Sequence, residues 1–445
     1  MVRAWCTAFA EFCRLVQNPP IMHCDMPALA KNYKRWVLAL LTAAYTCNAM
    51  DRGIVSIIGQ SMKEDLRLSD TQLGLLGGTA FAALYALGGI PMARLAERFN
   101  RVNIISAALI VWSSLTTLCG LAANFAQLLL GRAGVGVAES GCTPPAHSLI
   151  SDYFEPARRA SALSVYSSGI SAGYVLAAII GGYVAQHLGW RAACAIVGLP
   201  GVLVAIALKL AVREPARPVA PPTSLRGELS EMRAVARILI VDRRALNMIL
   251  GVTVSAFANY GLYAFAPLYF HRAFGLDYTQ TGLIAAVTGG VAVGIGIVAG
   301  GYAADRLARR NPRWYALVPA FGTFLAIPFY GLSAMAEDWR WAALSLAAAG
   351  LFQYASLGPT FGVVQNSVGI RQRATATALL YVFLNVVALG GGPVFTGWVI
   401  DRFAADGVPL ALATRHGLTV ALIFYTWASV HYFLAAASPV QSDSM

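Results

Sequence analysis

Charged residues are scarce in this chain: they make up 12% of its 445 residues, against about 25% in typical soluble proteins. Hydrophobic residues reach 58%, and the mean hydropathy is +0.61. This balance excludes an ordinary soluble protein and predicts an all-α integral membrane protein. Twelve apolar runs are long enough to cross a bilayer as helices: 35–59, 71–93, 102–123, 125–151, 158–187, 191–211, 246–271, 279–303, 313–335, 340–367, 373–400 and 416–437.

Acidic residues are especially few, with 21 Asp and Glu against 33 Lys and Arg, which gives a net charge of +12. If the twelve runs span the membrane, 24 Lys and Arg lie on the side of the N-terminus, 7 on the opposite side and 2 inside spans. Because cytoplasmic loops carry the excess of Lys and Arg, this asymmetry predicts cytoplasmic N- and C-termini. It assigns the basic residues to orientation and to lipid headgroups, so we expect no nucleic-acid partner.

Cysteine is absent after Cys194, and the seven cysteines lack the spacing of a disulfide framework or a metal site. The chain also lacks a His-Glu-x-x-His motif and a nucleotide-binding domain. We therefore expect no enzyme, no catalytic residue, no metal and no cofactor. Residues 1–33 lack the apolar core of a removed signal peptide, and Asn-x-Ser/Thr sequons are absent. These features favour a multi-pass protein of a bacterial inner membrane.

A proline-rich segment, Glu214-Pro-Ala-Arg-Pro-Val-Ala-Pro-Pro, interrupts the chain after the sixth apolar run, as is typical of an exposed connection. In the next segment, 229–245, apolar residues and arginines are spaced as in an amphipathic helix on a membrane surface. We predict five parts: a cytoplasmic leader 1–33, an N-terminal six-helix bundle 34–213, a cytoplasmic linker with an amphipathic helix 214–245, a C-terminal six-helix bundle 246–438 and a cytoplasmic tail 439–445.

An internal repeat relates the two halves. The segment Ala93-Arg-Leu-Ala-Glu97-Arg98-Phe-Asn-Arg101 returns 208 residues later as Gly301-Tyr-Ala-Ala-Asp305-Arg306-Leu-Ala-Arg309. Each copy places an acid beside an arginine on the cytoplasmic side. Ion pairs there can lock two helical bundles together and release them when they break. We therefore predict a cytoplasmic gate formed by Glu97, Arg98, Arg101, Asp305, Arg306 and Arg309.

The two copies resemble the Gly-x-Leu-Ala-Asp-Arg-x-Gly-Arg-Arg loop signature of the major facilitator superfamily. The first copy departs from it at Ala93, Glu97 and Asn100. The resemblance covers the six-plus-six layout of nearly the whole chain. It implies two pseudo-symmetric six-helix bundles, a substrate site between them near the middle of the membrane, and alternating access.

Four charged residues fall inside predicted spans: Asp51 and Arg52 in the first run, and Arg132 and Glu139 in the fourth. An ionisable group at the membrane centre costs ~2.5 to 3.5 kcal/mol on insertion scales, so these four need partners or water. Two acids and two bases sum to zero. Arg132 and Glu139 are seven residues apart, which places them on one helix face about 10 Å apart along the axis. Mutual pairing is therefore possible.

The repeat provides an internal control for these charges. At the 208-residue offset, Asp51-Arg52-Gly53 corresponds to Asn259-Tyr260-Gly261, which carries no charge. The bundle architecture therefore does not require the charged residues, and they indicate chemistry confined to the N-terminal half.

Burial and a neighbouring guanidinium act on the pKa of a carboxyl group in opposite directions. We hypothesise that Glu139, together with Asp51, takes up a proton and thereby loosens its hold on Arg52 or Arg132. A freed arginine can bind a phosphate or carboxylate through two parallel hydrogen bonds. A proton gradient is then the energy source.

A narrower resemblance follows from the residues around these charges. Asn48-Ala-Met-Asp51-Arg52 resembles the Asn-Tyr-x-Asp-Arg signature in the first helix of Spinster-type transporters, with Ala49 in place of the tyrosine. Arg132-Ala-Gly-Val-Gly-Val-Ala-Glu139-Ser is similar to the fourth helix of that family, and Gly189-Trp190-Arg191 continues the match. The resemblance implies proton-linked movement of lysophospholipids or phosphorylated sphingoid bases.

An anionic lipid with one tail needs a cationic anchor beside an apolar, aromatic track. Arg52, Arg132 and Asn48 are the predicted substrate and charge network. The candidate cavity-lining residues are Phe81, Tyr85, Asn259, Tyr260, Phe265, Gln353, Tyr381 and Asn385.

Other functions stay open at this point. The same fold could export a small-molecule drug, a sugar phosphate or an organic anion, and a passive facilitator or sensor would need no proton coupling. A membrane-embedded enzyme would need a nucleophile with a base, or a metal set, facing the cavity. We expect a monomer whose partners are the membrane and an amphiphilic substrate.

Overall fold

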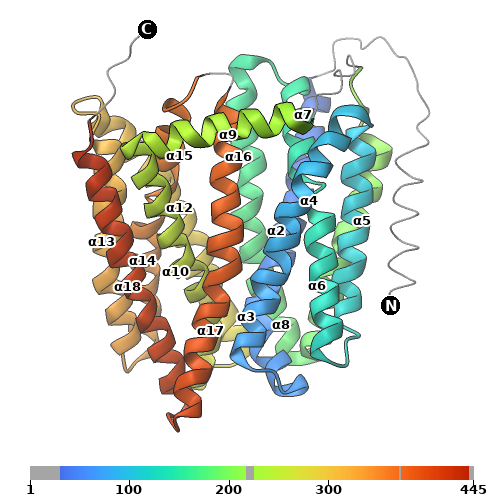
Figure 1. Cartoon of the computed structure of the whole chain (residues 1–445). Coiled ribbons are helices and arrows are strands. Elements are labelled where there is room, and N and C mark those ends of the chain that lie inside the picture. Colours follow the sequence, from blue (N-terminus) through green and yellow to red (C-terminus); the bar gives the residue numbers. More distant parts are fainter. Residues whose placement is uncertain (1–30, 217–224, 370–371, 440–445) are drawn as a thin grey trace. The chain divides into compact units, whose positions relative to one another are not determined.

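The structure, a computed structural model, describes residues 31–216, 225–369 and 372–439, so most of the predicted leader and tail lie outside it. Every regular element within these ranges is a helix (Figure 1). Contacts divide the chain into two units. Unit 1 comprises Met1–Leu68 and Ala80–Pro221, and unit 2 comprises Ser69–Thr79 and Pro222–Met445. Apart from Ser69–Thr79, the change from one unit to the other falls within the segment 214–245 that was predicted as a linker.

Unit 1 is built on one very long helix and the helices that pack on it. Its elements are α2 (Lys31–Leu66), α4 (Thr79–Arg98), α5 (Arg101–Cys119), α6 (Phe125–Glu139), α7 (Thr143–Tyr153) and α8 (Pro156–Ala211). Helix α8 contacts α2 and α5, and α5 contacts α6. Gly189 breaks α8 with φ of 82°, a left-handed value that glycine adopts without steric cost. The break separates the predicted spans 158–187 and 191–211.

Unit 2 contains the remaining helices. They are α3 (Asp70–Gly77), α9 (Leu225–Val241), α10 (Arg243–Phe274), α11 (Tyr278–Ala285), η1 (Ala286–Val291), α12 (Ala292–Ala308), α13 (Trp314–Met335), α14 (Trp339–Tyr354), α15 (Leu357–Asn366), α16 (Arg373–Val382), η3 (Phe383–Leu389), α17 (Gly390–Ala405) and α18 (Leu410–Ala437). Helix α18 packs on α10 and α13, and α14 packs on α12 and α13. The elements η1 and η3 are π-helical turns inside longer spans.

These helices account for all twelve predicted spans. Seven helical segments of the described chain are long and apolar enough to cross a membrane by length and composition, and the broken α8 supplies two spans from one segment. The four other spans are α2, which carries Asp51 and Arg52, and the pairs α3–α4, α6–α7 and α14–α15, each divided by a short turn.

The 208-residue repeat is visible in how the helices begin and end. Ser69 and Asp277, 208 residues apart, each form a capping box with a glutamine three residues on. Helices α2 and α10 also end 208 residues apart. Asp51 and Asn259 therefore occupy equivalent places in their helices.

Helix α3 groups with unit 2, although the predicted N-terminal bundle 34–213 includes it. Asp401 on α17 accepts hydrogen bonds from the main-chain N of Asp70 and Thr71, at 2.9 and 2.8 Å, and so satisfies the first amides of α3. Asp70 forms a buried ion pair with Arg272 on α10, at 2.7 Å, and Arg272 also donates to Thr414 at 2.9 Å. These polar contacts hold α3 on unit 2.

Candidate functional site

Asp51 lies at a point in unit 1 where three helices meet. Its side chain is buried, with Oδ2 accepting a hydrogen bond from Thr116 of α5 at 2.5 Å and Oδ1 from Nη1 of Arg132 on α6 at 3.0 Å. Both carboxylate oxygens therefore have partners. A buried ion pair needs such additional hydrogen bonds to offset the desolvation of its charges.

Arg52 faces a different partner from its neighbour Asp51. Its Nε donates to Oε2 of Glu139 at 2.8 Å. Glu139 is the last residue of α6 and is fully buried, whereas 30% of the Arg52 side chain is exposed. Arg132 and Glu139, two turns apart on α6, thus pair with consecutive residues of α2. The structure brings the four predicted charges together as two neighbouring ion pairs.

Four buried polar atoms of the residues that make up this site have no hydrogen-bond partner among the described residues. They are Oε1 of Glu139, Nδ2 of Asn48, Nη2 of Arg52 and Nε of Arg132. A buried polar atom without a partner costs about 1–3 kcal/mol, more when the group is charged. The open oxygen of Glu139 is therefore a place where a proton, a water molecule or a ligand group would be stabilised.

The guanidinium of Arg52 is flanked by aromatic rings of α4. It lies 4.8 Å from the ring centre of Phe81 and 4.5 Å from that of Tyr85, which is cation–π geometry. Gly136 lets α6 approach α4 here, because a Cβ at this position would lie 2.5 Å from the main-chain O of Phe81. The two rings and Glu139 thus contact the same guanidinium.

A second aromatic group beside α2 was not predicted from the sequence. Tyr45 stacks on Tyr166 of α8 with ring centres 4.4 Å apart, and His147 meets Tyr166 edge-on. Tyr45, Asn48 and Arg52 recur at helical spacing on α2, so this periodicity could have revealed Tyr45. No local pattern identifies Thr116 or Tyr166, which come from other helices.

The equivalent position in unit 2 is neutral. Asn259 on α10 donates a hydrogen bond to the hydroxyl of Tyr354, and its Oδ1 accepts from Tyr425 at 3.3 Å and Tyr330 at 3.5 Å. The rings of Tyr330 and Tyr425 stack at 4.8 Å. An amide and three phenols therefore fill the place that the ion pairs occupy in unit 1.

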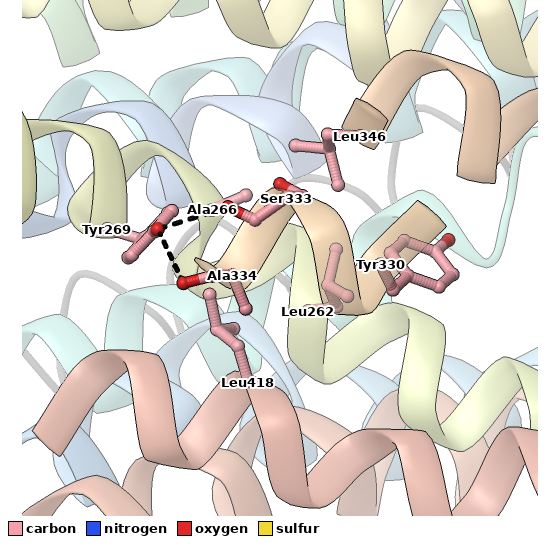
Figure 2. A pocket seen from close by; sticks show the side chains of 8 residues that line it. All are labelled: Leu262, Ala266, Tyr269, Tyr330, Ser333, Ala334, Leu346 and Leu418. Atoms are coloured by element: carbon pink, nitrogen blue, oxygen red, sulfur yellow. Dashed lines mark hydrogen bonds between the residues drawn. The ribbon is translucent and has the colours of Figure 1, made fainter. Parts of the chain in front are cut away.

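A small cavity lies next to this tyrosine cluster in unit 2. Figure 2 shows Tyr269 reaching the main-chain oxygens of Ser333 and Ala334, at 3.2 and 3.4 Å, in the wall of the cavity. The lining residues are Leu262, Ala266, Tyr269, Tyr330, Ser333, Ala334, Leu346 and Leu418. None of them is charged, so the cavity offers no opposite charge to an ionic group.

The other predicted cavity residues have varied surroundings within unit 2. Phe265 and Gln353 are buried, and Oε1 of Gln353 has no hydrogen-bond partner among the described residues. Tyr260 is half-buried. Tyr381 is exposed, and its main-chain O accepts a hydrogen bond from Asn385 at 2.8 Å. Their role in lining a substrate cavity stays a prediction.

In the first copy of the predicted gate, one arginine, Arg101, is buried within unit 1. Arg101 is fully buried and pairs with Asp152 and Glu214, each at 2.6 Å, while it also donates to Ser148 at 2.8 Å. It joins the start of α5 to the end of α7 and to the segment after α8. Arg98 is exposed, and the side chain of Glu97 lies outside the described part.

The second copy has exposed charges in unit 2. Asp305 accepts a hydrogen bond from Tyr315 at 2.9 Å, and Arg306 donates to Tyr302 at 3.3 Å. Arg309 is exposed. The two copies thus share sequence but differ in burial and partners, and a gating role for either stays a prediction.

The sequence analysis missed the burial of three charged side chains at helix ends: Asp70, Arg272 and Arg101, the last of which was predicted as a gate residue. Each lies at the boundary of a predicted span, where a charged residue usually reaches water. Their burial depends on partners at least 47 residues away along the chain, and no sequence pattern signals such partners.

The described residues contain a serine motif that some enzymes use, but its structural setting does not suit a catalytic serine. The pattern Gly169-Ile-Ser171-Ala-Gly173 lies inside continuous helix α8, with both glycines facing α2, and not on the strand-to-helix turn that a nucleophilic serine uses. No group of His, Cys, Asp and Glu among the described residues could hold a metal ion. The described cysteines, Cys47, Cys119, Cys142 and Cys194, are free and buried.

Comparison with known proteins agrees with this architecture. The family model described as Major Facilitator Superfamily matches residues 41–393. An MFS-type efflux pump of Mycolicibacterium smegmatis is 32% identical over 90% of this chain and 92% of its own length. Protein spinster homolog 1 of Bos taurus is 27% identical over 93% of this chain and 83% of its own length.

A solved structure extends the match to the fold. The crystal structure of a bacterial homologue of the human lysosomal transporter Spinster, in an inward-facing and unoccupied conformation, superimposes with a TM-score of 0.83 at 31% identity. The match covers 93% of this chain and all of that one. The predicted fold of twelve membrane helices in two six-helix bundles is confirmed. The chain therefore belongs to the major facilitator superfamily, is similar to Spinster proteins within it, and is a membrane transporter.

Proposed function

We propose that this protein is a proton-coupled secondary active transporter that moves an anionic, single-tailed lipid by alternating access. The lipid is of the lysophospholipid or phosphorylated sphingoid-base type, with which Spinster proteins are associated. The observation that carries the proposal is the Arg52–Glu139 pair. It combines an arginine whose side chain is 30% exposed with a fully buried carboxylate that has one oxygen without a partner among the described residues.

In this mechanism, Glu139 is the residue that exchanges the proton. A proton on Oε1 makes the carboxyl group neutral, so the electrostatic attraction between two opposite charges is lost and Arg52 is held only by its hydrogen bond to the other oxygen. Asp51 has partners on both oxygens, so we assign it to holding Arg132 in place. Of the two acids predicted to couple proton movement, Asp51 and Glu139, we therefore propose that Glu139 alone carries the proton.

Arg52 then becomes available to the substrate. Its guanidinium can offer two parallel N–H groups to a phosphate, while Phe81 and Tyr85 keep it oriented through their ring faces. The same rings offer an apolar surface to the part of the lipid tail that is next to the headgroup. Release of the proton restores the Glu139 carboxylate, which competes for Arg52 and expels the headgroup.

The test is transport of a lysolipid panel in proteoliposomes, with and without an imposed pH gradient. Glu139→Gln should lower the rate of gradient-driven net transport by about tenfold or more. A tenfold change corresponds to ~1.4 kcal/mol. Exchange of lipid across the membrane without net proton movement should continue. Glu337→Gln, in the exposed loop between α13 and α14, is the matched control and should transport normally. Unchanged gradient-driven transport in Glu139→Gln would refute the proton assignment.

A second candidate function is export of a drug or organic anion. It is favoured by the 32% identity with a protein named as an efflux pump. Arg52 could anchor any anion of suitable size. Competition of radiolabelled lysolipid uptake by small organic anions separates the two: strong competition by the anions supports the second function, and its absence supports the lipid.

We also propose that both termini face the cytoplasm of a bacterial cell and that the protein acts as a monomer in the inner membrane. The distribution of Lys and Arg supports the orientation, because 24 lie on the side of the termini and 7 on the other.

A further inference from the structure

One helix of unit 2, α9, lies across the ends of neighbouring helices of the same unit instead of running with them (Figure 1). It contacts α10 and α16 of the same unit. Val235 and Leu239 are buried in the core that these helices share, and Thr375 on α16 donates a hydrogen bond to Glu231 at 3.3 Å. One face of α9 is therefore fixed to the unit.

The rest of the α9 surface combines arginines with uncovered apolar side chains. Arg233 and Arg237, one turn apart, are exposed, and so is Arg243 just after the helix. Ile240 and Val241 are 61% and 72% exposed. No carboxylate in the described part of the chain forms an ion pair with these three arginines. Within the described residues, these arginines therefore have no ion-pair partner, and the two apolar side chains are largely uncovered.

The neighbouring loop continues this surface. Nη2 of Arg244 donates to the main-chain O of Pro312 at 2.7 Å, which ties the α9–α10 turn to the loop between α12 and α13. That loop exposes three further arginines, while Asp305 beside it is engaged by Tyr315. We call the six exposed arginines the basic rim: Arg233, Arg237, Arg243, Arg309, Arg310 and Arg313.

The basic rim lies at the level where membrane spans begin. Arg243 is the first residue of α10, and Arg313 directly precedes α13, and both helices are apolar and long enough to cross a bilayer. Residues at the ends of spanning helices lie among lipid headgroups. Arginine forks match phosphate oxygens, and an amphipathic helix in the interface places aliphatic side chains at the boundary of the acyl chains.

We propose that the basic rim binds the phosphate groups of anionic phospholipids, with Ile240 and Val241 entering the boundary between headgroups and acyl chains. Orientation by positive charge alone would not need exposed aliphatic residues between the arginines. An acidic protein segment would match the charges, but it would not account for the position of the rim at the ends of the spans. The proposal is independent of which substrate the protein carries.

The test is hydrogen exchange of the α9 amides in the full chain, placed in nanodiscs of phosphatidylcholine alone or with phosphatidylglycerol. We expect exchange in α9 to slow by about tenfold in the anionic discs, because basic side chains at an anionic surface gain binding energy. Arg233→Gln/Arg237→Gln should lose this protection. The matched control Arg340→Gln/Arg402→Gln, exposed arginines elsewhere in unit 2, should keep it.

Inorganic phosphate added to the phosphatidylcholine discs separates a lipid site from a simple anion site. Protection by phosphatidylglycerol and not by free phosphate supports the proposal. Equal α9 exchange in the two kinds of disc overturns it, and so does equal protection by free phosphate. Loss of protection in the Arg340/Arg402 control also overturns it, because the effect would then follow net charge and not the rim.

Discussion

Positions 51 and 259 occupy equivalent places in the two halves of the chain, yet ion pairs surround the first and neutral hydrogen bonds surround the second. In unit 1, Asp51 pairs with Arg132, and the adjoining Arg52 pairs with Glu139. In unit 2, Asn259 is held by three tyrosine hydroxyls without any charge. The same helical framework thus accepts either solution. Charge at this place serves something other than holding the bundle together.

The energetic difference between the two places has a clear origin. A buried ion pair must recover the desolvation of two charges, and apolar replacements of such pairs are often as stable or more stable. A satisfied network of neutral hydrogen bonds has no such cost. Unit 1 therefore retains an arrangement that stability alone does not favour, which is expected if its charges take part in the transport cycle.

The largest expected effect comes from removing one charge of the better-satisfied pair. Asp51→Asn leaves Arg132 buried without a counter-charge, and we expect the free energy of unfolding to fall by about 3–5 kcal/mol. Denaturant titration of the purified protein in detergent micelles measures this loss.

The double variant Asp51→Asn/Arg132→Gln is the control. It removes both charges together, so it should recover most of the lost stability while transport stays impaired. If the double variant were less stable than Asp51→Asn alone, the two residues would not act as a pair, and the contrast with Asn259 would fail.

A smaller effect is expected at the equivalent neutral position. Asn259→Leu removes the shared partner of three tyrosine hydroxyls, and we expect a loss of about 2 kcal/mol in the free energy of unfolding. Because this place carries no charge, the ratio of transport with and without a pH gradient should stay as in the unmodified protein. A changed ratio would show that unit 2 also takes part in proton coupling.

The smallest effect concerns an exposed pair at the end of α2, outside the spans. Hydrogen bonds from Arg191 and then Trp190 hold the pKa of Asp65 below its usual value of 3.8. A carboxyl with a lowered pKa stabilises the fold above the unfolded-state pKa, and this contribution disappears as the pH falls through the folded-state pKa. Asp65→Asn should therefore lower the free energy of unfolding near neutral pH by less than about 1 kcal/mol.

This difference should vanish once the pH falls below the folded-state pKa of Asp65, because the carboxyl group is then protonated in both states. Unfolding of both proteins followed against pH measures it. A difference of the same size in acid would mean that Asp65 acts through packing and not through its charge.

Much of the architecture could be predicted because the membrane imposes it. Long apolar runs must form helices, since lipid offers no partners for main-chain polar groups, and the runs gave all twelve spans. The 208-residue repeat correctly aligned Asp51 with Asn259. The four charges in the spans were also evident, because ionisable groups stand out against an apolar background.

The ion-pair and hydrogen-bond partners within the site were harder to predict from the sequence. Helical spacing placed Arg132 and Glu139 on one face of α6, but it did not tell which partner each one takes. Thr116 and Tyr166 reach the site from α5 and α8, and their own neighbours in sequence carry no sign of it. The position of α3 with unit 2 was also missed, because its partners Asp401 and Arg272 lie more than 200 residues away.

The sequence by itself determined that this protein is a bundle of membrane helices whose charges within the spans lie in its first half, because hydropathy and helical spacing are local properties of the chain. Only the tertiary structure decided that Asp51 is fully satisfied while Glu139 keeps one open oxygen, and that Arg52 stays partly exposed against two rings. These properties depend on which atoms of distant helices come within hydrogen-bonding distance, and packing alone sets that distance.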